Sequence, residues 1–252
     1  MTEIFVAVCF FVIPLIGLLQ RAPWGSLWDE LSTPTARDAM RLSLECSLWA
    51  TGLSILFGLP LAWVLARVEF PGRAIVRALT LLPLVLPPVV GGVALLLAFS
   101  RNSLIGGWLH DWFGVQLTFS KAGTVLAETF VAMPFFVITV EAALRSSDRR
   151  YEEAAATLGA KRWTVFRRVT LPMILPSIAA GAALSWARAL GEFGATITFA
   201  GSFPGRTQTM PIAVYYALET RPDEAIVLSL VLLTVSVVVL LTLRDHWVRG
   251  SG

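Results

Sequence analysis

YEEAAATLGAKRWTVFRRVTLP, residues 151–172, is a polar and basic segment between two long apolar blocks. Its alanine-rich beginning favours a helix, and Gly159 is of the type that commonly ends one. A second amphipathic turn follows. We therefore predict two short helices with a bend at Gly159, with Leu158, Trp163 and Phe166 on an apolar face. The residues alone allow two interpretations, a basic helix lying on anionic lipid or a docking site for a protein partner.

Outside this segment the 252-residue sequence is unusually apolar. Hydrophobic residues make up 56% of it and charged residues only 15%, whereas soluble domains carry about 25% charged residues. So little charge cannot cover a soluble surface, which argues against an ordinary soluble enzyme or a disordered chain. The net charge of +3 is too small to indicate a nucleic-acid partner. The composition indicates an integral membrane protein.

Six apolar blocks are candidates for membrane-spanning helices, because a helix needs about 20 apolar residues to cross a bilayer. Helices also satisfy their own backbone polar groups in lipid, and the blocks lack the alternation of a membrane barrel. The blocks are residues 4–19, 44–66, 75–99, 122–144, 171–200 and 225–243. We therefore predict an all-α integral membrane protein with six transmembrane helices. Glu128 and Glu141 are expected near the ends of the fourth span, within reach of solvent.

The first block, residues 4–19, has an alternative interpretation. Glu3 precedes it and Arg21 follows it, so the charges do not favour its orientation. A secretory signal peptide would need a basic beginning and a small-residue cleavage site, and neither is evident. We expect a membrane helix. Without it, the chain would have five spans and an external N-terminus.

Most lysine and arginine residues lie on one predicted side of the membrane, and loops rich in these residues stay in the cytoplasm. The loop 145–172 and the C-terminus are therefore predicted to be cytoplasmic. The residues that carry this prediction are Arg67, Arg73, Arg77, Arg145, Arg149, Arg150, Lys161, Arg162, Arg167, Arg168, Arg244 and Arg249.

The sequence offers no recognisable catalytic or metal-binding motif. It lacks the phosphate-binding P-loop, the zinc-protease motif and the hydrolase nucleophile elbow. Cys9 and Cys46 lie in or beside apolar blocks at different depths, and His110 and His246 stand alone in loops. We therefore expect no catalytic residue, no metal and no cofactor on this chain. A membrane enzyme would need a nucleophile, a metal or an acid pair.

Two charges lie inside the fifth block, at Arg188 and Glu192. Their spacing of four residues places them on one face of a helix. Charges at bilayer depth usually face a bundle interior or a wet cavity. A structural ion pair is as good an explanation as contact with a transported ion. Thr196 and Thr198 can offer hydroxyl groups to an oxyanion or bond to their own helix.

Glycines and prolines interrupt the third and fifth blocks. Gly191 and Gly194 permit close helix approach or a break beside the charged pair. Pro87 and Pro88 remove helical hydrogen bonds in the third block. Broken helices at this depth often line a transport route, although a fixed kink for packing is the alternative. The candidate translocation pathway consists of Pro87, Pro88, Arg188, Gly191, Glu192, Gly194, Thr196 and Thr198.

The spacing in the polar segment resembles the signature loop of the membrane subunits of ABC importers. The pattern is Glu-Ala-Ala, three residues, Gly, nine residues, an apolar residue, one residue and Leu-Pro. It falls on Glu153, Ala154, Ala155, Gly159, Val169, Leu171 and Pro172. In that family the loop, here 145–172, holds a coupling helix that sits in a cleft of a separate cytoplasmic ATPase. The resemblance implies a type I importer permease fold, an ATPase-coupling role for these residues, and ATP-Mg on the partner ATPase.

A narrower resemblance, covering most of the chain after about Arg41, is to the molybdate, tungstate and sulfate permease group, and within it to molybdate permeases. It is carried by FPGR at 70–73, LPLVLPPVV at 82–90, WARALGEFGATITF at 186–199 and PGRTQTMP at 204–211. It implies a homodimer in a prokaryotic inner membrane, an ATPase dimer, and an extracytoplasmic oxyanion-binding protein that delivers molybdate to outer loops including 202–211.

The predicted organisation is a permease domain over residues 41–252, preceded by an N-terminal transmembrane helix and outer loop over residues 1–40. Sulfate or thiosulfate, and tungstate, are alternative substrates. A lone channel or secondary transporter is an alternative of another class, but it leaves the spacing of the 145–172 loop unexplained.

Overall fold

The computed structural model describes the backbone of residues 1–249 and the side chains of residues 1–242, and all regular structure in that part is helical. The predicted all-α fold is confirmed. Arg244 and Arg249, which carried part of the predicted charge asymmetry, lie outside the described side chains. The elements are α1 (Thr2–Gln20), α2 (Leu27–Leu31), α3 (Pro34–Arg67), α4 (Arg73–Val85), α5 (Pro88–Phe99), α6 (Leu104–Phe113), α7 (Lys121–Ser146), α8 (Arg150–Thr157), α9 (Arg162–Val165), the π-helical turn η1 (Phe166–Thr170), α10 (Leu171–Leu190), α11 (Gly194–Ala200), α12 (Met210–Thr220) and α13 (Pro222–Arg249).

Five helical stretches are long and apolar enough to cross a membrane, which are α1, α3, α7, the run Arg162–Leu190 that ends with α10, and α13. The pair α4 and α5 makes a sixth if it counts as one span, and its two halves are bent by 119°. The predicted third span is therefore broken. The break lies at Leu86 and Pro87, whose backbones are extended, and Pro88 begins α5 at a position where a helix tolerates proline.

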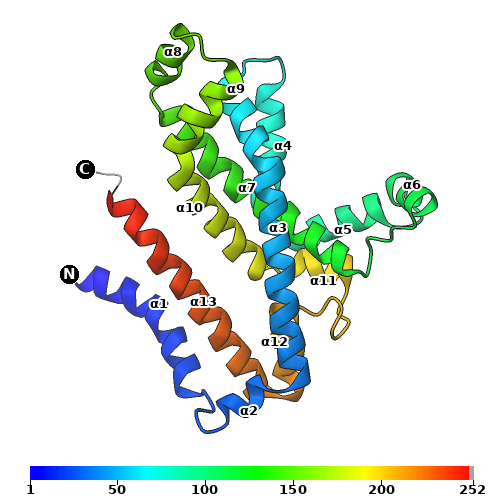
Figure 1. Ribbon diagram of the computed structural model, residues 1–252. Coiled ribbons are helices and arrows are strands. Elements are labelled where there is room, and N and C mark those ends of the chain that lie inside the picture. The colour runs from blue at the N-terminus through cyan, green and yellow to red at the C-terminus, as the bar shows by residue number, and fades with distance from the viewer. Residues whose placement is uncertain (250–252) are drawn as a thin grey trace.

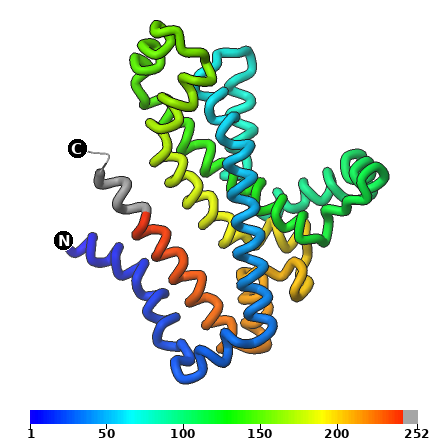
Figure 2. Tube along the Cα trace, in the orientation of Figure 1, coloured from blue at the N-terminus to red at the C-terminus, as the bar shows by residue number. Residues whose placement is uncertain are grey.

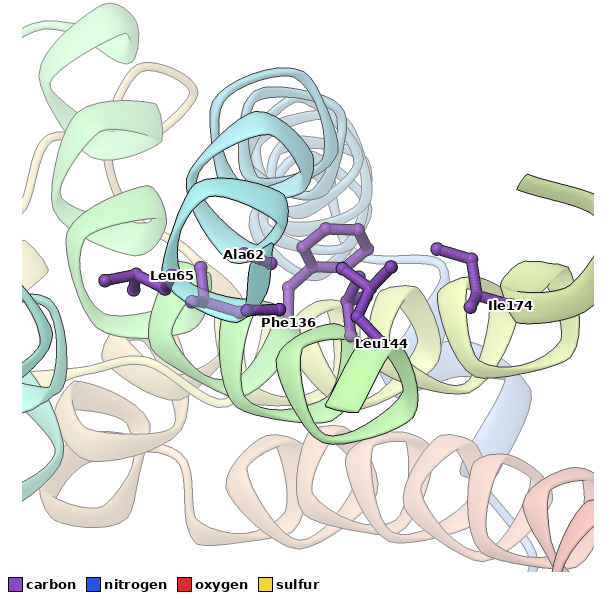
Figure 3. Packing of buried hydrophobic residues seen from close by; sticks show 8 residues of the cluster. Ala62, Leu65, Phe136, Leu144 and Ile174 are labelled. Atoms are coloured by element: carbon purple, nitrogen blue, oxygen red, sulfur yellow. The ribbon is translucent and has the colours of Figure 1, made fainter. Parts of the chain in front are cut away.

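The centre of the bundle is made by α3, α7 and α10 (Figure 1). Ala50, Ala132 and Ala189, one from each helix, form a fully buried cluster. Such small side chains let membrane helices approach closely. A larger apolar cluster lies nearer the 145–172 loop. It includes Ala62, Leu65, Phe136, Leu144 and Ile174 (Figure 3).

The two terminal helices, α1 and α13, run side by side along one flank of the bundle (Figures 1 and 2). None of the residues of α1 is buried, which suits a helix surrounded by lipid. The predicted N-terminal helix is thus present.

The bundle has two distinct ends. The elements α8 and α9 lie at one end beside the beginning of α4, and α2 and α12 lie at the other (Figure 1). The helix α10 starts at the α8–α9 end and runs toward the opposite half of the bundle, so it connects the 145–172 loop with the charged pair predicted as part of the pathway.

Candidate functional site

The 145–172 loop forms two short helices separated by a bend at Gly159, as predicted. Gly159 has a φ of +84°, in the left-handed region, and its N–H donates to the carbonyl of Ala156 at 2.9 Å. The rings of Trp163 and Phe166 stack with centroids 5.7 Å apart. Leu158 and Trp163 are 88% and 68% exposed, so the loop presents an uncovered apolar surface at the end of the bundle.

The residues of the Glu-Ala-Ala pattern do not form one patch. Glu153 and Ala154 are exposed on α8, whereas Ala155 is partly covered. Leu171 and Pro172 belong to the first turn of α10, on the far side of the π-helical turn. The structure therefore divides the pattern between the exposed helix α8 and the start of a membrane span.

A polar cluster that the sequence did not predict holds the loop against the bundle. Arg67 Nη2, at the end of α3, donates to Glu152 Oε1 at 2.9 Å and to Ser147 Oγ at 2.7 Å. Thr170 Oγ1 donates to the same Glu152 oxygen at 3.0 Å. In the sequence, the one indication of this cluster was that a second glutamate, Glu152, precedes Glu153.

A second cluster closes the same end of the bundle around Glu141. Its carboxylate pairs with Arg77 from α4 and, at 2.9 Å, with Arg145. Arg73 Nε donates to the carbonyl of Leu65 at 2.9 Å, which satisfies a carbonyl in the last turn of α3. The expectation that Glu141 reaches solvent was wrong, because α4 folds over it.

The expectation for Glu128 was also wrong. Its side chain is buried, and its Oε2 atom has no hydrogen-bond partner in the described part of the chain. The helix α7 that carries it packs against α3, α10 and α11. A sequence cannot show this enclosure, because the covering helices come from distant segments.

Arg188 and Glu192 form the expected ion pair, with Arg188 Nη1 and Glu192 Oε2 2.5 Å apart. Glu192 is only 1% exposed, and its other oxygen, Oε1, accepts from the backbone N–H of Ala195 at 2.8 Å. Glu192 thereby binds the first turn of α11, across the break at Gly191. The pair therefore has a structural role in addition to any contact with a transported ion.

The start of α11 lies directly against α5. A Cβ atom at Gly194 would lie 2.9 Å from the Cβ of Pro88. Thr198 Oγ1 donates to the carbonyl of Gly194 in its own helix at 2.8 Å, whereas Thr196 is buried and its hydroxyl has no partner among the described residues. The structure thus brings Pro88, Gly194 and the charged pair to one region, with Pro87 exposed beside them.

The loop 201–209, which was predicted to be an outer loop, is held closed by the side chain of Thr207. Thr207 Oγ1 accepts from the N–H of Phe203 at 3.0 Å and donates to the carbonyl of Gly201 at 3.3 Å. The N–H of Met210 donates to Ser43 Oγ on α3 at 2.7 Å. The side chain of Thr207 is therefore structural, and the exposed part of the loop is the turn around Gly205.

Replacing Gly92 with alanine is expected to destabilise the contact between α5 and α11. Its Cβ would lie 2.7 Å from the Cβ of Thr198 and 2.8 Å from the carbonyl oxygen of Ala195, so backbone must move. Overpacking of this kind costs about 1–3 kcal/mol. We expect a thermal unfolding midpoint several degrees lower in detergent, with reduced transport.

Gly52→Ala on α3 is the matched control for this substitution. A Cβ there would meet nothing within 4 Å, and alanine is favoured over glycine in a helix by about 1 kcal/mol. Its unfolding midpoint should stay level or rise. Equal midpoints for the two variants would contradict the close contact at Gly92.

Residues 55–250 match the family described as binding-protein-dependent transport system inner membrane component. The molybdenum transport system permease protein ModB of Mycobacterium tuberculosis is 48% identical over 236 residues, which cover 93% of this chain and 88% of that protein. ModB of Escherichia coli is 43% identical, covering 83% of this chain and 92% of that protein. The sulfate transport system permease protein CysT of Escherichia coli is 37% identical, covering 86% of this chain and 79% of that protein.

Solved structures share the fold. A chain of a bacterial ABC transporter that imports the acidic polysaccharide alginate superposes with a TM-score of 0.75 at 22% identity, covering 100% of this chain and 94% of that chain. The same kind of transporter in complex with a periplasmic protein gives a TM-score of 0.70 at 21% identity, covering 95% and 91%. At such identities the likeness shows the architecture, which is the importer permease fold that the sequence predicted.

Proposed function

Since this chain belongs to the family of binding-protein-dependent transport system inner membrane components, we propose that it is the permease subunit of an ATP-driven importer that translocates molybdate. The observation that carries the substrate is the identity of 43–48% to molybdenum permeases over most of the chain. The identity to the sulfate permease CysT is lower, at 37%. Sulfate is therefore the competing substrate to test, and tungstate is the other.

The transport route is formed by two copies of the chain. The candidate residues on one protomer lie where α10 breaks into α11 and α11 meets α5. A neutralised arginine suits an anion that must also leave, because a deep cationic well would trap it. The Arg188–Glu192 pair meets this requirement, since the arginine is 26% exposed while its charge is balanced.

The energy comes from two ATPase subunits that bind the 145–172 loops. The exposed side chains of Leu158 and Trp163 offer each ATPase subunit an apolar contact, and the exposed Glu153 and Arg162 offer charges of both signs. ATP-Mg is bound by the ATPase, and this chain contributes no catalytic residue and no cofactor. ATP binding closes the ATPases, moves the loops and turns the route outward, and hydrolysis resets it.

The chain is a multi-pass protein of a prokaryotic inner membrane with its loop 145–172 and its C-terminus in the cytoplasm. Clusters of arginine at the α8–α9 end support this orientation. The opposite end, with the turn around Gly205, receives an extracytoplasmic oxyanion-binding protein.

Reconstitution of the chain with its ATPase and binding protein in proteoliposomes tests the proposal. We expect uptake of molybdate that requires ATP and persists in excess sulfate. Tungstate as a second competitor measures the preference between the two metal oxyanions. Uptake abolished by sulfate would assign the chain to sulfate transport, and uptake without the ATPase would overturn the importer proposal.

A further inference from the structure

The carboxylate of Glu152 connects the helix α8 to the ends of three membrane spans. It accepts from Arg67 at the end of α3 and from Thr170 just before α10, at 2.9 and 3.0 Å. The same Arg67 nitrogen donates to Ser147, which caps the end of α7. One acidic side chain on α8 thereby joins this helix to α3, to the start of α10 and, through Arg67, to the end of α7.

The cluster is more enclosed than an ordinary surface ion pair. The side chain of Arg67 is 7% exposed and that of Glu152 is 23% exposed. Exposed pairs contribute little, whereas loss of one partner from an enclosed pair leaves a poorly solvated charge. The cluster therefore holds α8 in one place on the bundle.

The backbone between α8 and α10 contains two places where it can bend. The first is the bend at Gly159, and the second is the π-helical turn Phe166–Thr170. Turns of this kind are often sites of bending. The hydrogen bond from Thr170 to Glu152 spans both points, so a displacement of α8 is passed to the first turn of α10 directly.

The two neighbouring glutamates face different surroundings. Glu153 is exposed and makes no side-chain hydrogen bond or ion pair in the described part of the chain, whereas Glu152 points into the cluster. The exposed residue is free to contact a partner. The inward residue is placed to receive the resulting movement.

The far end of α10 carries the Arg188–Glu192 pair. The helix has 20 residues, and at 1.5 Å per residue it extends about 30 Å. A displacement at Thr170 therefore reaches the candidate route along one continuous helix.

We propose that the cluster of Arg67, Glu152 and Thr170 is the joint that transmits movement of α8 to α3, α7 and α10. Glu152 is a positioning residue in this proposal, which rests on the proposed function as an ATP-driven permease. It predicts that breaking the cluster separates ATP hydrolysis from transport.

The test measures molybdate taken up per ATP hydrolysed in proteoliposomes, together with recovery of the assembled complex. Glu152→Ala removes the acceptor, and alanine keeps the helical preference of α8. We expect the ratio to fall by about tenfold, the scale of typical coupling between sites, while the ATPase still binds and hydrolyses ATP. Glu152→Gln retains an acceptor and should recover part of the ratio.

Thr170→Val is the milder variant, because it removes only the hydroxyl donor and leaves the Arg67–Glu152 pair. It should lower the molybdate uptake per ATP less than Glu152→Ala does. If Glu152→Ala does not assemble, Thr170→Val tests the proposed joint in its place. Glu69→Ala is the matched control, since Glu69 is an exposed glutamate two residues beyond Arg67 without an ion pair among the described side chains. Its ratio should equal that of the wild type.

Two results would overturn the proposed joint and leave the proposed function standing. The first is wild-type uptake per ATP in Glu152→Ala, and the second is an unchanged ratio in Thr170→Val when Glu152→Ala yields no complex. A lower yield of complex with an unchanged ratio would show that the cluster only supports folding. Failure of the wild type to transport molybdate would instead overturn the proposed function, and the joint with it.

Discussion

Gly159→Pro is expected to abolish ATP-dependent uptake while the chain remains in the membrane. The φ of Gly159 is +84°, whereas proline is restricted to about −65°. Proline also lacks the N–H that donates to Ala156. The bend that orients α8 and α9 would therefore be lost, although the membrane spans are untouched.

Asparagine and alanine at position 159 provide the graded controls. Asparagine tolerates the left-handed conformation, so Gly159→Asn should transport nearly as well as the wild type. Gly159→Ala should be intermediate, because the left-handed conformation costs about 1–2 kcal/mol for an ordinary residue. A Cβ atom there meets nothing within 4 Å, so the difference is conformational. Uptake, ATPase activity and the amount of chain in the membrane fraction are measured for each variant.

Undiminished uptake in Gly159→Pro would contradict the docking role of the loop. The interpretation of the loop as a basic helix on anionic lipid would then be the better one. Loss of the chain from the membrane would contradict the expectation that the membrane spans fold without the bend at Gly159.

Arg188→Ala is expected to cause a severe loss of assembled protein. It leaves the carboxylate of Glu192, only 1% exposed, without its partner at 2.5 Å. Breaking a buried pair in this way costs about 3–5 kcal/mol. Size-exclusion chromatography of the complex and its thermal midpoint measure the loss.

The second substitution shows what the pair does. The double variant Arg188→Ala, Glu192→Ala removes the unpaired charge, but it also removes the acceptor for the N–H of Ala195. The double variant Arg188→Ala, Glu192→Gln removes the charge and keeps an acceptor. Of these two double variants, we expect the one with glutamine at position 192 to give more assembled protein. If it assembles and transports, the pair is needed for packing. If it assembles without transporting, the pair belongs to the route.

Arg41→Ala is the control for the loss of an arginine from a pair with the same spacing. Arg41 and Glu45 are 2.9 Å apart, but the side chain of Arg41 is 81% exposed. Exposed pairs contribute about 0–1 kcal/mol, so assembly should be unchanged. Assembly of Arg188→Ala at the level of this control would contradict the burial of Glu192.

Short-range patterns were sufficient for much of the architecture. The length of the apolar blocks predicted the spans, since about 20 residues are needed to cross lipid whatever the rest of the chain does. The glycine after an alanine-rich run predicted the bend at Gly159, and the spacing of four residues predicted the Arg188–Glu192 pair. Each of these depends on residues within a few turns of one another.

Other features depend on contacts between distant segments, and only the tertiary structure decided them. The 119° bend between α4 and α5 accommodates the close contact of Gly92 with α11. Glu141 is buried because α4 folds over α7. Arg67 and Glu152 are 85 residues apart in sequence and meet because the end of α3 lies against the end of α7, where Arg67 also binds Ser147. The sequence by itself thus determined which segments are long and apolar enough to span the membrane and where the loop bends. The packing of the spans decided which charges meet, because a contact partner is set by three-dimensional proximity and not by local spacing.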